Sequence, residues 1–133
     1  MSNKQLFREK YTVTYIPKHV LHIEVNDFEV FKVNDLLDIR NWIQEEIEES
    51  KLFNLFQFGN GSSLSRELRE YASKKEGAVR TIGTAILVRN LAQQLLIDYY
   101  LKINKPHYPT RAFYKKEKAI EWIDDYIKNL KDS

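Results

Sequence analysis

Residues 52–88 read LFNLFQFGNGSSLSRELREYASKKEGAVRTIGTAILV, and this stretch is the most informative about how the chain folds. It contains two apolar runs, residues 52–58 and 81–88, each with the length and composition of a buried strand. Between them lie a loop rich in glycine and serine and a polar segment, Ser65 to about Lys74, that predicts a short helix ending before Gly77. A strand, a helix and a second strand in this order favour parallel pairing of the two strands.

The segment before this unit predicts antiparallel strands. Apolar and polar residues alternate over 11–15 and again over 21–25, and the Pro17-Lys18 step between them can turn the chain. A third short strand, Phe28 to Phe31, is expected after an Asn-Asp turn, so that the chain opens with a β-meander. Residues 1–10 are expected to form a flexible or loosely attached N-terminus.

Helical periodicity appears in three other segments. Apolar residues at spacings of three and four run from Leu36 to Ile47, with Asn34 as the expected N-cap. Asn90 and Gln93 form a capping-box pattern at the start of a second helix, which Pro106 and Pro109 follow. Its expected core row is Leu95, Leu96, Tyr99 and Ile103. A short strand at 111–114 is expected before the final helix, whose expected apolar face is Ala119, Ile120, Ile123, Ile127 and Leu130.

These elements together predict a single α/β domain over residues 1–133. The expected sheet is mixed and has four to five strands, with an N-terminal antiparallel hairpin followed by parallel strand–helix units. About four helices are expected to pack on it.

Composition excludes several classes of function. The 133 residues carry 21 Lys and Arg against 19 Asp and Glu, a balance that makes nucleic acid an unlikely main partner. There is no cysteine, which excludes disulfides and thiolate chemistry. The longest apolar runs are a few residues, so we expect no membrane span and no signal peptide, and a cytoplasmic location. The three histidines lack the spacing of a zinc site, so neither a metal nor another cofactor is expected.

The loop after the first buried strand is the first candidate site. It consists of Gly59, Gly61, Ser62, Ser63 and Ser65, directly before a helix N-terminus, where backbone N–H groups favour an anion. A serine in this place can bind or accept phosphate. The alternative is a tight turn in which Ser65 is simply the helix N-cap, and that alternative is favoured.

A second candidate is an interaction surface. Its expected members are Arg66, Arg69, Tyr100, Lys102 and Lys105. Tyr99 and Tyr100 must point to different sides of one helix, so one ring is available as an interface anchor. Asp98 is expected to pair with Lys102, four residues further on.

Four stretches resemble the SpoIIAA-like group, relatives of the STAS domain, and in particular an uncharacterised set of bacterial STAS-like proteins. They are SRELREY at 65–71, TAILV at 84–88, YLKINKP at 100–106, and TRAFY at 110–114 followed by KEKAIEWI at 116–123. The resemblance covers most of the chain from about residue 20. It implies helices on one side of the sheet, a role in binding or regulation, and no enzymatic activity.

The resemblance also implies where a switch would lie. In STAS antagonists a phosphorylated Ser or Thr stands where the central strand runs into its helix, which here corresponds to Ser62, Ser63 and Ser65. The sequence Leu64-Ser65-Arg66-Glu67 stands near the place of the antagonists' Asp-Ser-Ser-Gly pattern. The expected function is therefore a non-enzymatic regulatory module that contacts a protein partner or a second copy of itself. The alternative is a small-molecule or lipid-binding domain of the same fold.

Overall fold

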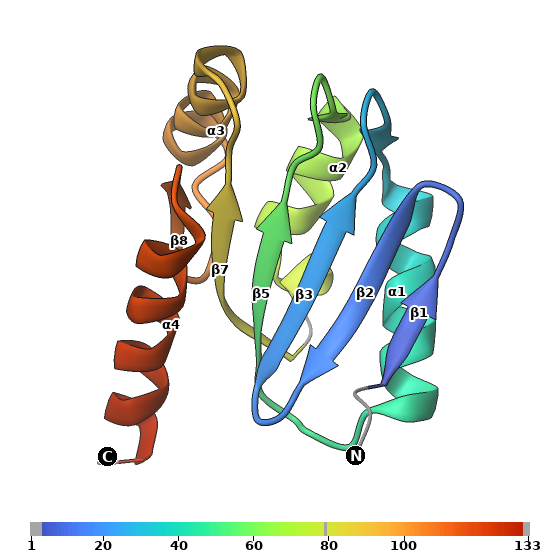
Figure 1. The fold of residues 1–133 in the computed structure, drawn as a ribbon, viewed down its shortest axis with the longest axis vertical. Coiled ribbons are helices and arrows are strands. Elements are labelled where there is room, and N and C mark those ends of the chain that lie inside the picture. Colours follow the sequence, from blue (N-terminus) through green and yellow to red (C-terminus); the bar gives the residue numbers. More distant parts are fainter. Residues whose placement is uncertain (1–3, 79, 132–133) are drawn as a thin grey trace.

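A six-stranded mixed sheet organises the chain (Figure 1). The computed structural model describes residues 4–78 and 80–131. Its strands are β1 (Gln5–Phe7), β2 (Tyr11–Ile16), β3 (Val20–Val25), β4 (Val30–Phe31), β5 (Leu52–Gln57), β6 (Ser63–Leu64), β7 (Thr81–Leu87) and β8 (Thr110–Phe113). Its helices are α1 (Val33–Glu46), α2 (Arg66–Ser73), α3 (Leu91–Ile103) and α4 (Lys116–Lys131), with a 3₁₀ turn, η1, at Lys75–Ala78.

The main sheet has the order β1-β2-β3-β5-β7-β8. Strands β1, β2 and β3 pair antiparallel, whereas β3, β5, β7 and β8 pair parallel. The predicted hairpin and the predicted parallel strand–helix units are thus confirmed. The sheet has six strands where four to five were expected, because the β1 strand was missed.

Strand β1 ties the N-terminal segment to the rest of the chain. Leu6 is buried, and Arg8 forms two hydrogen bonds to Asp38 of α1, at 2.8 and 3.0 Å. The Tyr11 hydroxyl donates to the same carboxylate, and the Arg8 guanidinium beside Asp38 lowers the pKa of that carboxyl. The expectation of a loosely attached segment over 1–10 therefore missed a paired strand; residues 1–3 lie outside the described part.

Helices cover both faces of the sheet, which corrects the expectation of helices on one side. Alternate residues of β5 belong to two separate hydrophobic clusters, Phe56 to one and Phe53 to the other. The first cluster receives α1, α2 and α3, whereas the second receives α4 through Ala119 and Ile123. Figure 1 shows α4 beside β8 and α1 across the opposite end of the sheet. Of the expected α4 face, Ile120 and Leu130 are exposed.

Two local predictions about the first half of the chain are wrong. The strand expected at 28–31 is only Val30–Phe31, and it pairs with β6 in a separate two-stranded ribbon instead of extending a meander. Helix α1 begins after Lys32, whose backbone N–H donates to the Asp35 carboxylate at 2.8 Å. Asn34 lies inside the first turn and is not the cap.

The phase of α3 also differs from the prediction. Its buried residues are Gln93, Ile97 and Tyr100. Leu95, Tyr99 and Ile103, expected in the core, are more than half exposed. Apolar residues occupy both sides of this helix, so apolar periodicity alone does not determine which side meets the sheet.

Candidate functional site

The glycine–serine loop connects β5 to α2, and the hydroxyls of Ser62 and Ser65 bond to the chain itself. Ser62 is buried and its hydroxyl donates to the Gly59 carbonyl at 3.0 Å. Ser63 pairs with Val30 through β6. Ser65 is the N-cap of α2, and its hydroxyl accepts the Leu68 N–H at 3.0 Å. These contacts support the predicted cap and give each serine a structural role.

Gln93 of α3 joins this loop to the next helix. Its side-chain amide is buried and donates to the carbonyls of Gly59 and Ser62, at 2.9 and 3.1 Å. Its carbonyl accepts the Arg89 N–H at 2.8 Å, while its own backbone N–H donates to Asn90. The capping function predicted for Asn90 is present. The Gln93 side chain in addition connects α3 to the glycine–serine loop.

The cap assignment has a direct test. Ser65→Ala is expected to lower the free energy of unfolding by about 1 kcal/mol, because the Leu68 N–H loses its acceptor. Ser65→Asp keeps an acceptor and is expected to retain wild-type stability. Urea unfolding of both variants, with Ser63→Ala as the matched control, measures the difference. Equal stability of Ser65→Ala and wild type would show that the hydroxyl does not cap α2.

Of the five residues expected to form an interaction surface, Tyr100 is not on the surface. Arg66 is exposed and pairs with Glu70 at 3.1 Å, and Arg69 donates to the Leu64 carbonyl at 2.8 Å. Lys102 and Lys105 are exposed. Tyr100 is buried and contributes to a pocket, so the exposed ring of the tyrosine pair is Tyr99.

A pocket between the sheet and α2 is the candidate functional site. It has a cavity volume of about 70 Å³ and lies on the face covered by α1, α2 and α3. The lining residues are Ile23, Phe31, Leu36, Asn54, Phe56, Leu64, Leu68, Ala72, Gly77, Thr81, Thr84, Ile86, Tyr100, Tyr108 and Thr110. None of these fifteen side chains is acidic or basic. Among these lining residues, Tyr100 alone was predicted to have a functional role.

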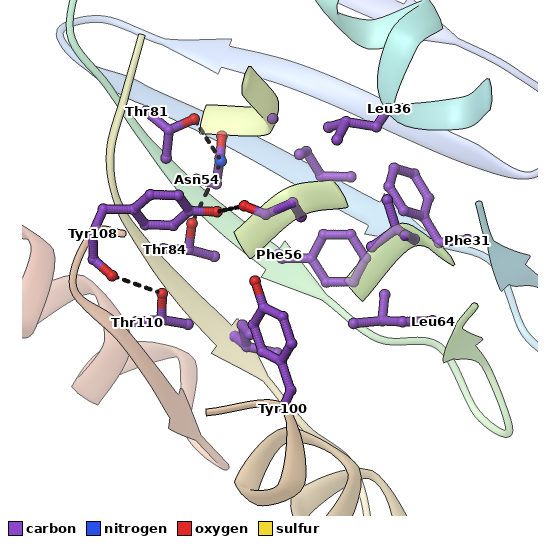
Figure 2. A pocket seen from close by; sticks show the side chains of 15 residues that line it. Phe31, Leu36, Asn54, Phe56, Leu64, Thr81, Thr84, Tyr100, Tyr108 and Thr110 are labelled. Atoms are coloured by element: carbon purple, nitrogen blue, oxygen red, sulfur yellow. Dashed lines mark hydrogen bonds between the residues drawn. The ribbon is translucent and has the colours of Figure 1, made fainter. Parts of the chain in front are cut away.

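The pocket has one polar and one apolar end. In Figure 2, Asn54, Thr81, Thr84 and Tyr108 gather on one side, and Phe31, Phe56 and Leu64 on the other. The Asn54 amide lies 3.5 Å from both threonine hydroxyls, at the limit of hydrogen bonding. Amide and hydroxyl groups held this loosely can reorient toward a guest.

Two buried tyrosines complete the polar end. The Tyr108 hydroxyl donates to the Ala72 carbonyl of α2 at 3.3 Å and also interacts with Tyr100 and Thr84. Burial raises the pKa of Tyr100, and the neighbouring Tyr108 adds to this effect. Burial likewise raises the pKa of Tyr108, although its hydrogen bonds to Thr84 and Tyr100 oppose the shift. Both phenols are therefore neutral at physiological pH.

Several other polar residues expected to have roles lie elsewhere. Asp98 is exposed and accepts a hydrogen bond from Gln94 at 2.8 Å, and no ion pair to Lys102 forms in the described part of the chain. His22, one of the three histidines, is buried and bonded to Gln57 at 2.9 Å. Within residues 4–78 and 80–131, no cluster of three or more His, Asp or Glu residues is arranged to hold a metal ion.

Comparison with known proteins defines the class of fold. A crystal structure of an uncharacterized protein of the DUF3478 family from Shewanella loihica PV-4, described as having a SpoIIAA-like fold, superposes with a TM-score of 0.54. The match covers 91% of each chain at 10% sequence identity, so it shows the fold alone. The chain thus has a SpoIIAA-like α/β fold.

A sequence profile then identifies the family. Residues 14–127 match the family described as a domain of unknown function, DUF7793, and the chain belongs to it. No curated protein matches the sequence. Among the helices of the described residues, none combines the length and apolar character needed to cross a membrane.

Proposed function

We propose that the chain is a non-catalytic binding module that holds a small, uncharged molecule in the pocket beneath α2. The observation that carries this proposal is the composition of the pocket wall. An apolar body is bordered at one end by amide and hydroxyl groups, and no acidic or basic side chain is among the residues that line it. Pockets of this composition bind ligands by apolar contact and use a few polar groups for orientation.

The absence of charged side chains among the lining residues disfavours charged ligands. A carboxylate or phosphate that enters loses its hydration, and no lining cation would compensate. An amide, alcohol or ketone loses less hydration and can bond to Asn54, Thr84 and Tyr108. The ligand is therefore expected to have one uncharged hydrogen-bonding group and a short apolar body.

Size restricts the ligand further. A cavity of about 150 Å³ lined by apolar side chains holds benzene, whereas this pocket measures about 70 Å³. A ligand larger than this cavity can bind only if α2 moves. Leu68 is the buried residue of this eight-residue helix, and the Tyr108–Ala72 hydrogen bond is a second attachment. A short molecule thus fits the site better than a long lipid chain.

The regulatory function implied by the family resemblance depends on an accessible serine in the loop. Burial of Ser62 and the capping role of Ser65 favour a structural role for that loop. Contact with a protein partner is supported by a different surface, on α3, which is considered separately below.

A matched pair of probes tests the proposal. Acetamide is expected to raise the thermal midpoint of the protein in a saturable way, whereas acetate, with the same carbon body and a charge, is not. Longer amides are expected to bind about fourfold more tightly for each added methylene until the pocket is full. Equal effects of the amide and the carboxylate, or no effect of either, would contradict the proposal.

The control for location is a pair of alanine-to-leucine variants on helices. Ala72→Leu projects into the pocket and is expected to abolish the amide effect. Ala92→Leu adds the same volume on the exposed side of α3 and is expected to leave that effect unchanged.

A further inference from the structure

An exposed apolar row runs along α3. Leu91, Leu95, Tyr99 and Ile103 follow one another at intervals of four residues, and each is more than half exposed. Residues four apart on a helix lie on one face. Single exposed apolar residues are ordinary, but a contiguous apolar patch on a surface marks an interaction site.

Charged groups border this row on both sides. On the side toward α2, Tyr99 and Ile103 line a shallow groove with Arg66, Arg69 and Glu70. Asp98 and Lys102 directly precede Tyr99 and Ile103 in the sequence. They lie on the other side of the row, away from α2. They have opposite charges and stand four residues apart, yet in the described residues they do not pair with each other.

We propose that this row is a dimer interface at which α3 packs antiparallel against α3 of a second copy, about a two-fold axis at Tyr99. Such an axis brings identical residues together. Leu95 then lies level with Ile103 of the second copy, because both stand four residues from Tyr99. Asp98 comes within about 3 Å, measured along the helix axis, of Lys102 of the second copy, and the symmetry repeats this ion pair.

Charge complementarity favours a second copy as the occupant. A two-fold axis perpendicular to the two helices places the Asp98 and Lys102 sides of both copies together, so each carboxylate meets an ammonium group. The α2 edges also meet each other, and each presents both Arg66 and Glu70. The chain therefore complements its own surface at this face.

The size of the row predicts a weak dimer. Burying the four side chains removes on the order of 500 Å² of apolar surface from water over both copies. Stable interfaces bury about 1,200–2,000 Å² in total. Even with a contribution from the α2 edges, we expect a dissociation constant in the micromolar to submillimolar range.

Sedimentation velocity from about 10 µM to about 1 mM tests the proposal. Wild type is expected to shift from monomer to dimer, and Leu95→Glu to remain monomeric throughout. Ile120→Glu places the same charge on exposed α4, on the opposite face of the sheet, and is expected to dimerise as wild type does. A wild type that stays monomeric, or a dimer that persists in Leu95→Glu, overturns the proposal and leaves the row to another occupant, such as an acidic partner helix.

Two further variants separate the interface from an effect on folding. Asp98→Lys alone is expected to weaken the dimer about tenfold or more, and the double variant Asp98→Lys, Lys102→Asp to restore it. Because the chain has no cysteine, Tyr99→Cys provides a single thiol that is expected to cross-link two copies under mild oxidation. Ile120→Cys is the control and is expected not to cross-link. Cross-linking of both variants to the same extent would overturn the two-fold arrangement.

Discussion

Replacement of Gln93 by leucine is expected to lower the free energy of unfolding by about 3–5 kcal/mol. Leucine has a similar volume but cannot donate to the Gly59 and Ser62 carbonyls or accept from the Arg89 N–H. The Gly59 carbonyl keeps its bond from the Ser62 hydroxyl. The loss therefore falls on the Ser62 carbonyl and the Arg89 N–H, at about 1–3 kcal/mol for each group left without a partner. This loss is a large fraction of the 5–15 kcal/mol that stabilises a typical domain.

The matched control stands next to it on the same helix. The Gln94 side chain bonds to the exposed Asp98, so Gln94→Leu is expected to change stability by less than about 0.5 kcal/mol. Urea unfolding of the two variants beside wild type measures both effects. Similar losses in the two variants would show that the bonds from Gln93 to the loop do not stabilise the fold.

The second large effect is expected at Gly59, where the chain leaves β5. A methyl group on Gly59 would lie 2.6 Å from the Val25 carbonyl oxygen, and 2.7 and 2.8 Å from backbone atoms of Asn26 and Asp27. These are main-chain atoms at the end of β3 and cannot rotate away as a side chain can. Gly59→Ala is therefore expected to cost about 3 kcal/mol.

Gly61, two residues later, provides the contrast. Its φ of +64° favours glycine, but asparagine tolerates this region, and the neighbouring atoms belong to the exposed ring of Phe28. Gly61→Asn is expected to cost about 1 kcal/mol. Thermal unfolding of both variants tests the difference, and a milder effect at Gly59 than at Gly61 would contradict the steric argument.

Much of the fold could be predicted because local signals and tertiary structure agree. The apolar runs at 52–58 and 81–88 became central parallel strands, and Ser65 and Asn90 became N-caps. Strand β1 could not be predicted, because it has only three residues and a single buried side chain, Leu6. The prediction of which side of α3 is buried was wrong, because the buried side contains the polar residue Gln93. Its side chain bonds to two loop carbonyls, and this contact cannot be inferred from the sequence.

The candidate site was less accessible to sequence reasoning. The loop was found, but the contacts of Ser62 and Ser65 with their own chain depend on tertiary structure. The pocket joins residues from β5, β7, α2 and the segment before β8, which are distant in sequence. Its available signal was the polar residues Asn54 and Thr84 within otherwise apolar strands, where a side chain facing the core needs a polar neighbour.

If the pocket beneath α2 binds a small, uncharged molecule, a chemical-shift titration of isotope-labelled protein with acetamide detects that binding residue by residue. Binding in the pocket predicts saturable shifts at Leu68, Thr84 and Tyr108, no such shifts with acetate, and their loss in Ala72→Leu. Shifts scattered over the surface, or pocket shifts that persist in Ala72→Leu, would contradict it.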